Sequence, residues 1–178
     1  MKKILLMMFL TVMISCSAES DENNTAISTE EYPDQETWNT NLVITKDGMR
    51  IGYLKAAHVK KYSSRKMTYF EDGLQVDFYN STGEHTSVLN SDGGWIHDVK
   101  QDMYAYGNVV VVSDSGATLY TDTLQWDNKL QKIISQIPVK ITTKDDTLFG
   151  DSFISDPDFS NYELINSRGS SSKKIMVE

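Results

Sequence analysis

Ser152 and the three histidines are the residues best suited to covalent chemistry. Ser152 stands in Gly150-Asp151-Ser152, a pattern found around the nucleophilic serine of some esterases. Such a serine needs a histidine as its general base, and in those esterases the histidine follows the serine in the chain. Here His58, His85 and His97 all precede it. We therefore expect no hydrolase, and the chain is not predicted to be an enzyme.

Acidic residues suggest a second kind of chemistry, either metal binding or acid–base catalysis. Asp145-Asp146 and Asp156-Pro157-Asp158 are acidic pairs, but they lack the ligand number of a dedicated calcium site and are typical of turns. The sequence has no H-x-H, H-E-x-x-H or C-x-x-C pattern, which zinc sites commonly use. A glycosidase needs two carboxylates at a set separation, and nothing selects such a pair. We expect neither a metal nor a cofactor.

Cys16 is the only cysteine, so no intramolecular disulfide can form. Lys2 and Lys3 precede an apolar run at 4–14, which is too short to span a membrane and has the form of a secretory signal. Met13-Ile14-Ser15-Cys16 has the form of a bacterial lipobox, with Met13 where Leu or Val is usual. We expect residues 1–15 to be a signal peptide and Cys16 to be lipidated. The alternative is a plain signal peptide that contains an incidental cysteine.

The net charge argues against nucleic acid as a partner. The chain has 17 basic and 25 acidic residues, and loss of residues 1–15 removes two lysines, leaving 15 − 25 = −10. Such a chain is a poor candidate for binding nucleic acid or for lying on an anionic membrane surface. Residues 16–37 are polar and acidic, so we expect a lipidated N-terminus and flexible tether there. The alternative is an ordered arm.

Residues 38–167 have the pattern of a single all-β domain, followed by a polar tail at 168–178. Apolar and polar residues alternate in 49–53, 74–78 and 139–141, and 108–113 is a β-branched run, as expected for strands. No long window has a helical period, and 55–66 is left as strand or turn. Turn signals recur about every ten residues, as in antiparallel folds. They are Lys46-Asp47-Gly48, Glu71-Asp72-Gly73, Ser81-Thr82-Gly83, Ser91-Asp92-Gly93-Gly94, Asp114-Ser115-Gly116 and Trp126-Asp127-Asn128.

A short motif repeats at a spacing of about 30 residues. Leu89-Asn90-Ser91-Asp92 aligns with Leu119-Tyr120-Thr121-Asp122 and again with Leu148-Phe149-Gly150-Asp151. A fixed period indicates stacked supersecondary units that share one interior. We expect each unit to contain a few strands, although coincidence is the alternative for so degenerate a repeat.

The stretch from Phe70 to Gly169 resembles the LptC family and, more broadly, the OstA-like domain of lipopolysaccharide export proteins. The motif Leu-x-Thr-Asp-x-Leu-x-Trp-Asp within 116–127 is the most specific part of the match. The other matching pieces are 73–79, 107–111, 133–135, 139–141 and 150–153. Residues 38–60 match loosely and the tether does not match.

This resemblance implies a twisted antiparallel sheet, a boat-shaped half β-jelly roll with open edges, whose interior holds acyl chains of lipopolysaccharide. It also implies a non-enzymatic bridge component that accepts lipopolysaccharide from inner-membrane ABC transporter subunits similar to LptF and LptG. That component would pass the lipid to an LptA-like periplasmic protein, with both partners joined by strand pairing at the sheet edges. Some relatives keep a transmembrane helix where this chain has a lipobox. We expect a periplasmic protein, lipid-anchored to the inner membrane.

Alternation and the repeat suggest which side chains line the groove. In any β domain the same residues would form the core, and in the valine run a slip of one residue exchanges the two faces. Basic residues Arg50, Lys55, Lys60, Lys61, Arg65 and Lys66 are candidates for lipid phosphates, but an ordinary solvated surface is the more economical interpretation. The predicted groove residues are Val76, Phe78, Val109, Val111, Leu119, Leu124, Trp126, Ile134, Val139, Ile141 and Phe153.

Two other functions fit the sequence. A surface lipoprotein that binds glycan or protein would suit the acidic residues after Cys16, which are compatible with sorting to the outer membrane. A purely structural protein would pair through its sheet edges and bind no lipid. We also expect the domain to self-associate, because an unpaired edge strand recruits other strands.

Overall fold

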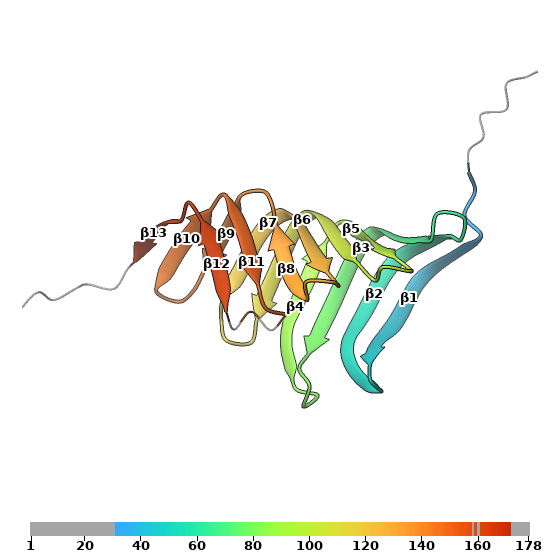
Figure 1. The fold of residues 1–178 in the computed structure, drawn as a ribbon, viewed down its shortest axis with the longest axis horizontal. Coiled ribbons are helices and arrows are strands. Elements are labelled where there is room, and N and C mark those ends of the chain that lie inside the picture. The colour runs from blue at the N-terminus through green and yellow to red at the C-terminus, as the bar shows by residue number, and fades with distance from the viewer. Residues whose placement is uncertain (1–30, 158, 160, 172–178) are drawn as a thin grey trace, which may run out of the picture. The chain divides into compact units, whose positions relative to one another are not determined.

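The structure is a computed structural model that describes residues 31–157, 159 and 161–171. The predicted signal peptide, Cys16 and most of the predicted tether lie outside these residues. The described part contains strands and turns, and it has no helix long and apolar enough to cross a membrane. The strands form one thirteen-stranded sheet in which every pairing is antiparallel, so the all-β prediction is confirmed (Figure 1). The strands are β1 (Gln35–Lys46), β2 (Met49–Tyr62), β3 (Met67–Tyr79), β4 (His85–Ser91), β5 (Gly93–His97), β6 (Met103–Ser113), β7 (Thr118–Asp127), β8 (Lys132–Ser135), β9 (Val139–Thr142), β10 (Asp146–Gly150), β11 (Ser152–Ser155), β12 (Tyr162–Ile165) and β13 (Arg168–Ser171).

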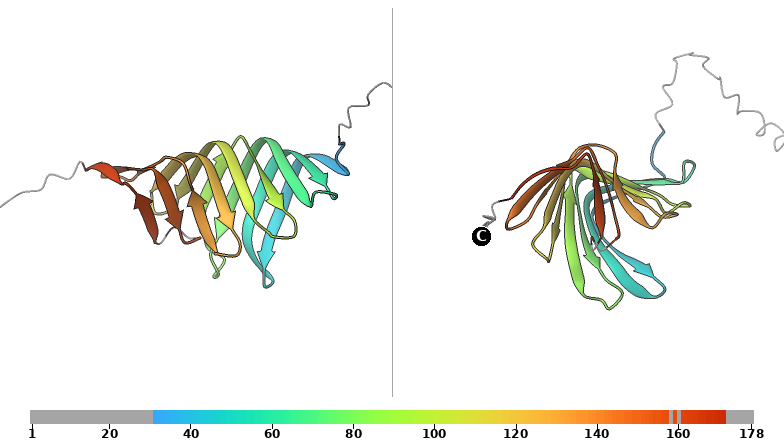
Figure 2. Two further views of the ribbon diagram at one scale, coloured as in Figure 1. Left: turned by 45° about the horizontal axis from the view of Figure 1, so that its top comes forward. Right: turned by 60° about the vertical axis from the view of Figure 1, so that its left-hand side comes forward.

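The sheet bends along a line that crosses its strands. β3 pairs with β5 through residues 67–70 and with β4 through residues 74–79. Likewise β7 pairs first with β9 and then with β8. β4 and β5 are thus two halves of one bent strand, as are β8 with β9 and β10 with β11. We call the half-sheet with β4, β9, β10 and β13 the β4 arm, and the half-sheet with β5, β8, β11 and β12 the β5 arm. In the right-hand view of Figure 2 the two arms diverge from their shared bend.

Left-handed backbone conformations produce the bend. Asp72 and Gly73 in β3 have φ of 62° and 116°, and Gly107 and Asn108 in β6 have φ of 72° and 49°. Backbone hydrogen bonds continue across the bend, because the Gly73 amide donates to the Asp92 carbonyl and the Asp92 amide donates to the Gly107 carbonyl, each at 2.9 Å. The extra residues act as bulges, which sharpen the local twist without ending the sheet.

Two predicted turns are therefore wrong. The stretches 71–73 and 91–94 have Asp-Gly pairs typical of reverse turns, but in the structure they are bends within strands. After each Asp-Gly pair the chain continues along the same bent strand, because strand partners are present on both sides of the bend. Asp and Gly supply left-handed φ values equally well to a bulge and to a turn, so sequence alone did not separate the two.

The 30-residue repeat corresponds to one pair of bent strands. Asp92 lies between β4 and β5, and Asp151 lies between β10 and β11. Asp122 lies in β7 where its partner changes from β9 to β8. The spacings are 122 − 92 = 30 and 151 − 122 = 29 residues. Each repeat thus carries the chain out and back over the β5 arm, through the bend of the next strand, and out and back over the β4 arm to the next equivalent bend.

The inner faces of the two arms carry the hydrophobic core. One row of cross-strand neighbours runs over the inner face of the β4 arm: Leu54, Val76, Leu89, Val111, Leu119 and Ile141. Phe70, Ala105 and Leu124 occupy the inner face of the β5 arm, and all of these side chains belong to one buried cluster. Alternation places every second residue of a strand on this side.

The strands extend beyond the predicted domain at both ends. β1 begins at Gln35, inside the segment predicted to be a tether, because Gln35 and Glu36 pair with Lys61 and Lys60 of β2. β13 lies inside the segment predicted to be a tail, where Arg168 pairs with Phe149 of β10. Neither segment has many apolar residues, and both take strand form from the sheet that they join.

Candidate ligand-binding groove

A cavity of about 570 Å³ lies between the two arms over strands β1 to β8. Its volume falls within the range of small-molecule pockets. Both arms contribute apolar side chains, so an occupant would contact hydrocarbon on two sides. The apolar lining comprises Ile44, Ile51, Leu54, Phe70, Leu74, Val76, Phe78, Leu89, Ile96, Met103, Ala105, Leu124, Trp126, Ile133 and Phe159.

Polar residues line the cavity where the turns of the two arms approach each other. Asn80 and Ser81 come from the β3–β4 turn of the β4 arm, and Lys46 from the end of β1. Gln131 and Asp156 come from turns of the β5 arm. We call this side the mouth. A groove with an apolar interior and a polar mouth suits a molecule that has both hydrocarbon chains and a polar head.

Asp156 is held at the mouth by two donors. Lys132 Nζ donates to Oδ1 at 2.7 Å, and Asn161 Nδ2 donates to Oδ2 at 2.9 Å. The hydrogen bond from Lys132, followed by that from Asn161, lowers the pKa of Asp156 below its usual 3.8. Because its charge is already compensated, Asp156 does not give the mouth an excess of negative charge.

Four of the predicted groove residues line this cavity, namely Val76, Phe78, Leu124 and Trp126. Six others are buried in the core and do not line the cavity: Val109, Val111, Leu119, Val139, Ile141 and Phe153, each at most 5% exposed. The predicted residues that line the cavity thus lie in β3 and β7, and the six others are buried in the core. We still propose lipid contact for the first four.

Ile134 is on the wrong face for a groove residue. Its neighbour Ile133 is buried, lines the cavity and pairs with Trp126, whereas Ile134 pairs with Gln125 and Ile154 and is only half-buried. β8 has only four residues, two of them adjacent isoleucines, so alternation in the sequence did not set its phase. Pairing with β7 and β11 sets it in the structure.

Several cavity residues were missed by sequence reasoning. Ile44, Leu54, Phe70, Ile96 and Met103 lie in strands whose alternation is broken by the bend or by bulges. Phe70 immediately precedes the Glu71-Asp72-Gly73 bend, which the sequence indicated as a turn. Recognition of that bend would have joined Phe70 to the same inner face as Val76.

Three of the six basic residues considered for phosphate binding are paired with carboxylates. Lys55 lies 4.0 Å from Asp77, and Lys61 lies 3.5 Å from Asp98. Lys60 donates to Glu71 at 2.8 Å, and this hydrogen bond raises the pKa of the lysine. None of them lines the cavity. The alternative of an ordinary solvated surface fits them better.

The remaining candidates for chemistry have local partners. His58 Nε2 lies 2.7 Å from Glu36 Oε1, His85 Nδ1 lies 2.8 Å from Asp114 Oδ2, and His97 Nδ1 accepts from the Val99 amide at 3.3 Å. Among the described residues, no hydrogen bond or ion pair joins Ser152 to a histidine. The same part of the chain has no group of His, Cys, Asp and Glu suited to a metal ion.

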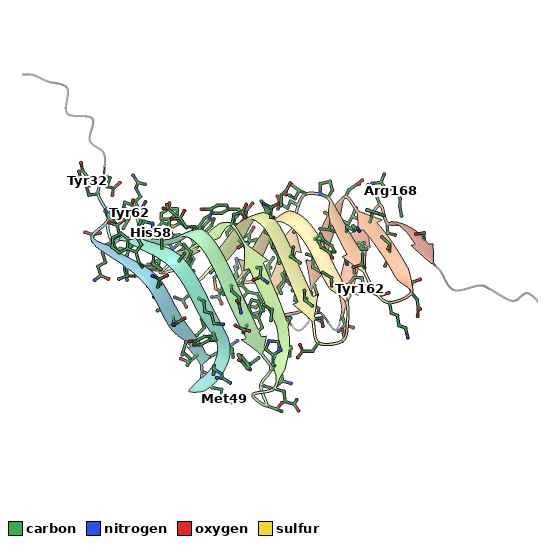
Figure 3. All side chains as sticks on the ribbon, turned by 180° about the vertical axis from the view of Figure 1, so that it is seen from behind. Tyr32, Met49, His58, Tyr62, Tyr162 and Arg168 are labelled. Atoms are coloured by element: carbon green, nitrogen blue, oxygen red, sulfur yellow. The ribbon has the colours of Figure 1, made fainter. Side chains whose placement is uncertain are left out.

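The sheet ends at strands with a single neighbour. β1 pairs only with β2, β12 only with β11, and β13 only with β10 among the described strands. Figure 3 labels Tyr162 of β12 and Arg168 of β13 near one end of the sheet, and Met49, beside β1, toward the other. Such edges carry unpaired backbone groups that accept another strand.

Comparison with known proteins agrees with this geometry. A family model described as "Lipopolysaccharide-assembly, LptC-related" matches residues 3–152. The crystal structure of LptH, the LptA homologous periplasmic component of the lipopolysaccharide transport device from Pseudomonas aeruginosa, superposes with a TM-score of 0.50 at 10% identity. That match covers 64% of this chain and 80% of LptH, and it bears on the fold alone. No curated protein matches. LptC-related proteins are non-enzymatic transport components, so the prediction that this chain is not an enzyme is confirmed. This chain belongs to the LptC-related family of lipopolysaccharide assembly.

Proposed function

We propose that this protein is a periplasmic bridge component of lipopolysaccharide transport that holds acyl chains between its two arms. The apolar cavity that both arms line is the observation that supports the proposal most strongly. Acyl chains cannot cross an aqueous space unaided, because exposure of apolar surface costs about 25 cal/mol per Å². A groove with hydrocarbon on two sides removes that cost and leaves the polar head at the mouth.

The two ends of the sheet are the proposed partner sites. β1 at one end and β12 with β13 at the other offer backbone groups for strand addition. Pairing at one edge with transporter subunits similar to LptF and LptG, and at the other with an LptA-like protein, would join the grooves end to end. Lipopolysaccharide would then move from groove to groove. An anchor at Cys16 in the inner membrane would keep one end near the transporter.

A binding experiment with the purified full chain tests this function. Phe78→Glu places a carboxylate in the apolar cavity, and Val112→Glu places one on the exposed outer face of β6. Because an ionised group in hydrocarbon is costly, we expect Phe78→Glu to weaken lipopolysaccharide binding more than tenfold and Val112→Glu to leave it unchanged. Circular dichroism should show folded sheet in both variants. Equal binding by the two folded variants, or no binding by the wild type, would remove the proposal.

A further inference from the structure

Lys46 provides the only cationic side chain among the residues that line the described cavity. It ends β1, and its Nζ donates to Oε1 of Gln131 at 3.0 Å. Gln131 is 85 positions later, in the turn between β7 and β8. Lys46 belongs to the β4 arm and Gln131 to the β5 arm, so this hydrogen bond spans the mouth. In Figure 3 the label of Met49, the cross-strand partner of Lys46, marks this end of β2.

The charge of Lys46 is not neutralised by the groups around it. Gln131 is a neutral acceptor, and no ion pair of the described residues includes Lys46, whereas Lys132 at the same mouth pairs with Asp156 at 2.7 Å. Asp47 is the next residue, in the exposed turn. A second cation, Arg50, lies 4.0 Å above the ring of Tyr79, which also lines the cavity. Among the residues that line the cavity, Lys46 is therefore a cation without a carboxylate partner, and it lies beside an apolar interior.

We propose that Lys46 is a head-group site, which binds a phosphate of the amphiphile whose acyl chains fill the cavity and exchanges Gln131 for a phosphate oxygen. The inference rests on the proposed function and adds the chemistry by which the groove selects its cargo. The ammonium gives either acceptor a charge-assisted hydrogen bond, but only the phosphate adds the attraction between opposite charges. The exchange is thus favourable for an anionic lipid and has no counterpart for a neutral one.

The same exchange opens the mouth. While Lys46 donates to Gln131, the two arms are connected across the entrance. In the proposed exchange a phosphate oxygen replaces Gln131 as the acceptor of Lys46, so binding of the head group and release of Gln131 are one step. A neutral lipid would have to break the hydrogen bond without replacing it.

The test compares the binding of two lipids to the wild type and to variants of Lys46. Lipid A with its phosphates and the same lipid after removal of the phosphates are titrated into the purified full chain. Because partly exposed charge pairs contribute up to about 1 kcal/mol and more when desolvated, we expect the wild type to bind the phosphorylated lipid roughly five- to tenfold more tightly. Lys46→Gln should abolish that preference without change for the dephosphorylated lipid, and Lys46→Arg should keep it.

Two further variants test whether the preference depends on Lys46 and its partner. Gln131→Glu leaves Lys46 in place but gives it a carboxylate partner, so it should also reduce the preference. Lys140→Gln removes a cation from the outer face of β9, where Lys140 lies 5.3 Å from the ring of Tyr120, and should change nothing. An equal loss for both lipids in Lys46→Gln, or an unchanged preference, overturns the inference. If the wild type binds neither lipid, the proposed function fails with it. If it binds both equally, only the role of Lys46 fails.

Discussion

Asn108 Nδ2 donates to Oδ2 of Asp92 at 2.8 Å, so a residue of β6 holds the bend between β4 and β5. Gly107 lies directly beside this contact, with φ of 72°. A Cβ atom at Gly107 would approach Oδ2 of Asp92 to 2.5 Å. The bend that separates the two arms thus depends on Gly107, which has no side chain, and on Asn108, which donates a hydrogen bond to the neighbouring strand.

We expect Gly107→Ala to destabilise the fold more than Gly48→Ala. Both glycines have left-handed φ, which costs an alanine about 1–2 kcal/mol, but only Gly107 has atoms in the way, since Gly48 has none within 4 Å. Displacement of the Asp92 carboxylate should add about 1 kcal/mol. Urea unfolding of the two variants measures the difference. Equal losses would mean that the Asp92 contact does not stabilise the bend.

The packed and hollow parts of the interior should respond differently to truncation. Phe153 is 2% exposed and packs against Phe159 and Tyr162, so Phe153→Ala should cost about 3–5 kcal/mol. Phe78 borders the cavity and is only half-buried, so Phe78→Ala should cost about 1–2 kcal/mol yet weaken lipopolysaccharide binding. Unfolding and lipid titration of the same two variants check this. Similar unfolding losses for both would contradict a hollow region at Phe78.

The stability contributed by Asp156 should depend on pH in a defined direction. Its folded pKa is lowered, chiefly by the hydrogen bond from Lys132, so the folded state favours the ionised carboxyl. The contribution is therefore complete above the usual pKa of 3.8 and is lost as the pH falls through the lowered value. The difference in unfolding free energy between wild type and Asp156→Asn should be constant from pH 7 to about pH 5 and shrink below pH 3.8. A difference that grew on acidification would refute the assignment.

Sequence reasoning found the fold class and family but not the hollow region. The match around 116–127 and the 30-residue repeat were informative, because Asp92, Asp122 and Asp151 occupy equivalent bends. The sequence did not predict which inward-facing residues are fully buried and which border the cavity. Val109 and Phe78 are both apolar and both point inward, yet one is fully buried and the other borders a cavity. That difference depends on how far apart the arms stand, which no local pattern records.

The short strand β8 shows a second limit. Ile133 and Ile134 have the same side chain and the same local sequence context, so the residue that faces the groove is decided by the register against β7 and β11. Lys46 was missed for a related reason. Its importance comes from Gln131 across the mouth, 85 residues away.

Site-specific photo-crosslinking in cells at Ile133 and at Ile134 tests the central claim most directly. The two positions are adjacent in the chain, but only Ile133 lines the cavity. We predict lipopolysaccharide adducts at Ile133, as at Phe78 and Trp126, and none at Ile134. Adducts at both isoleucines, or at neither in a folded and correctly localised protein, would contradict a lipid-carrying groove between the two arms.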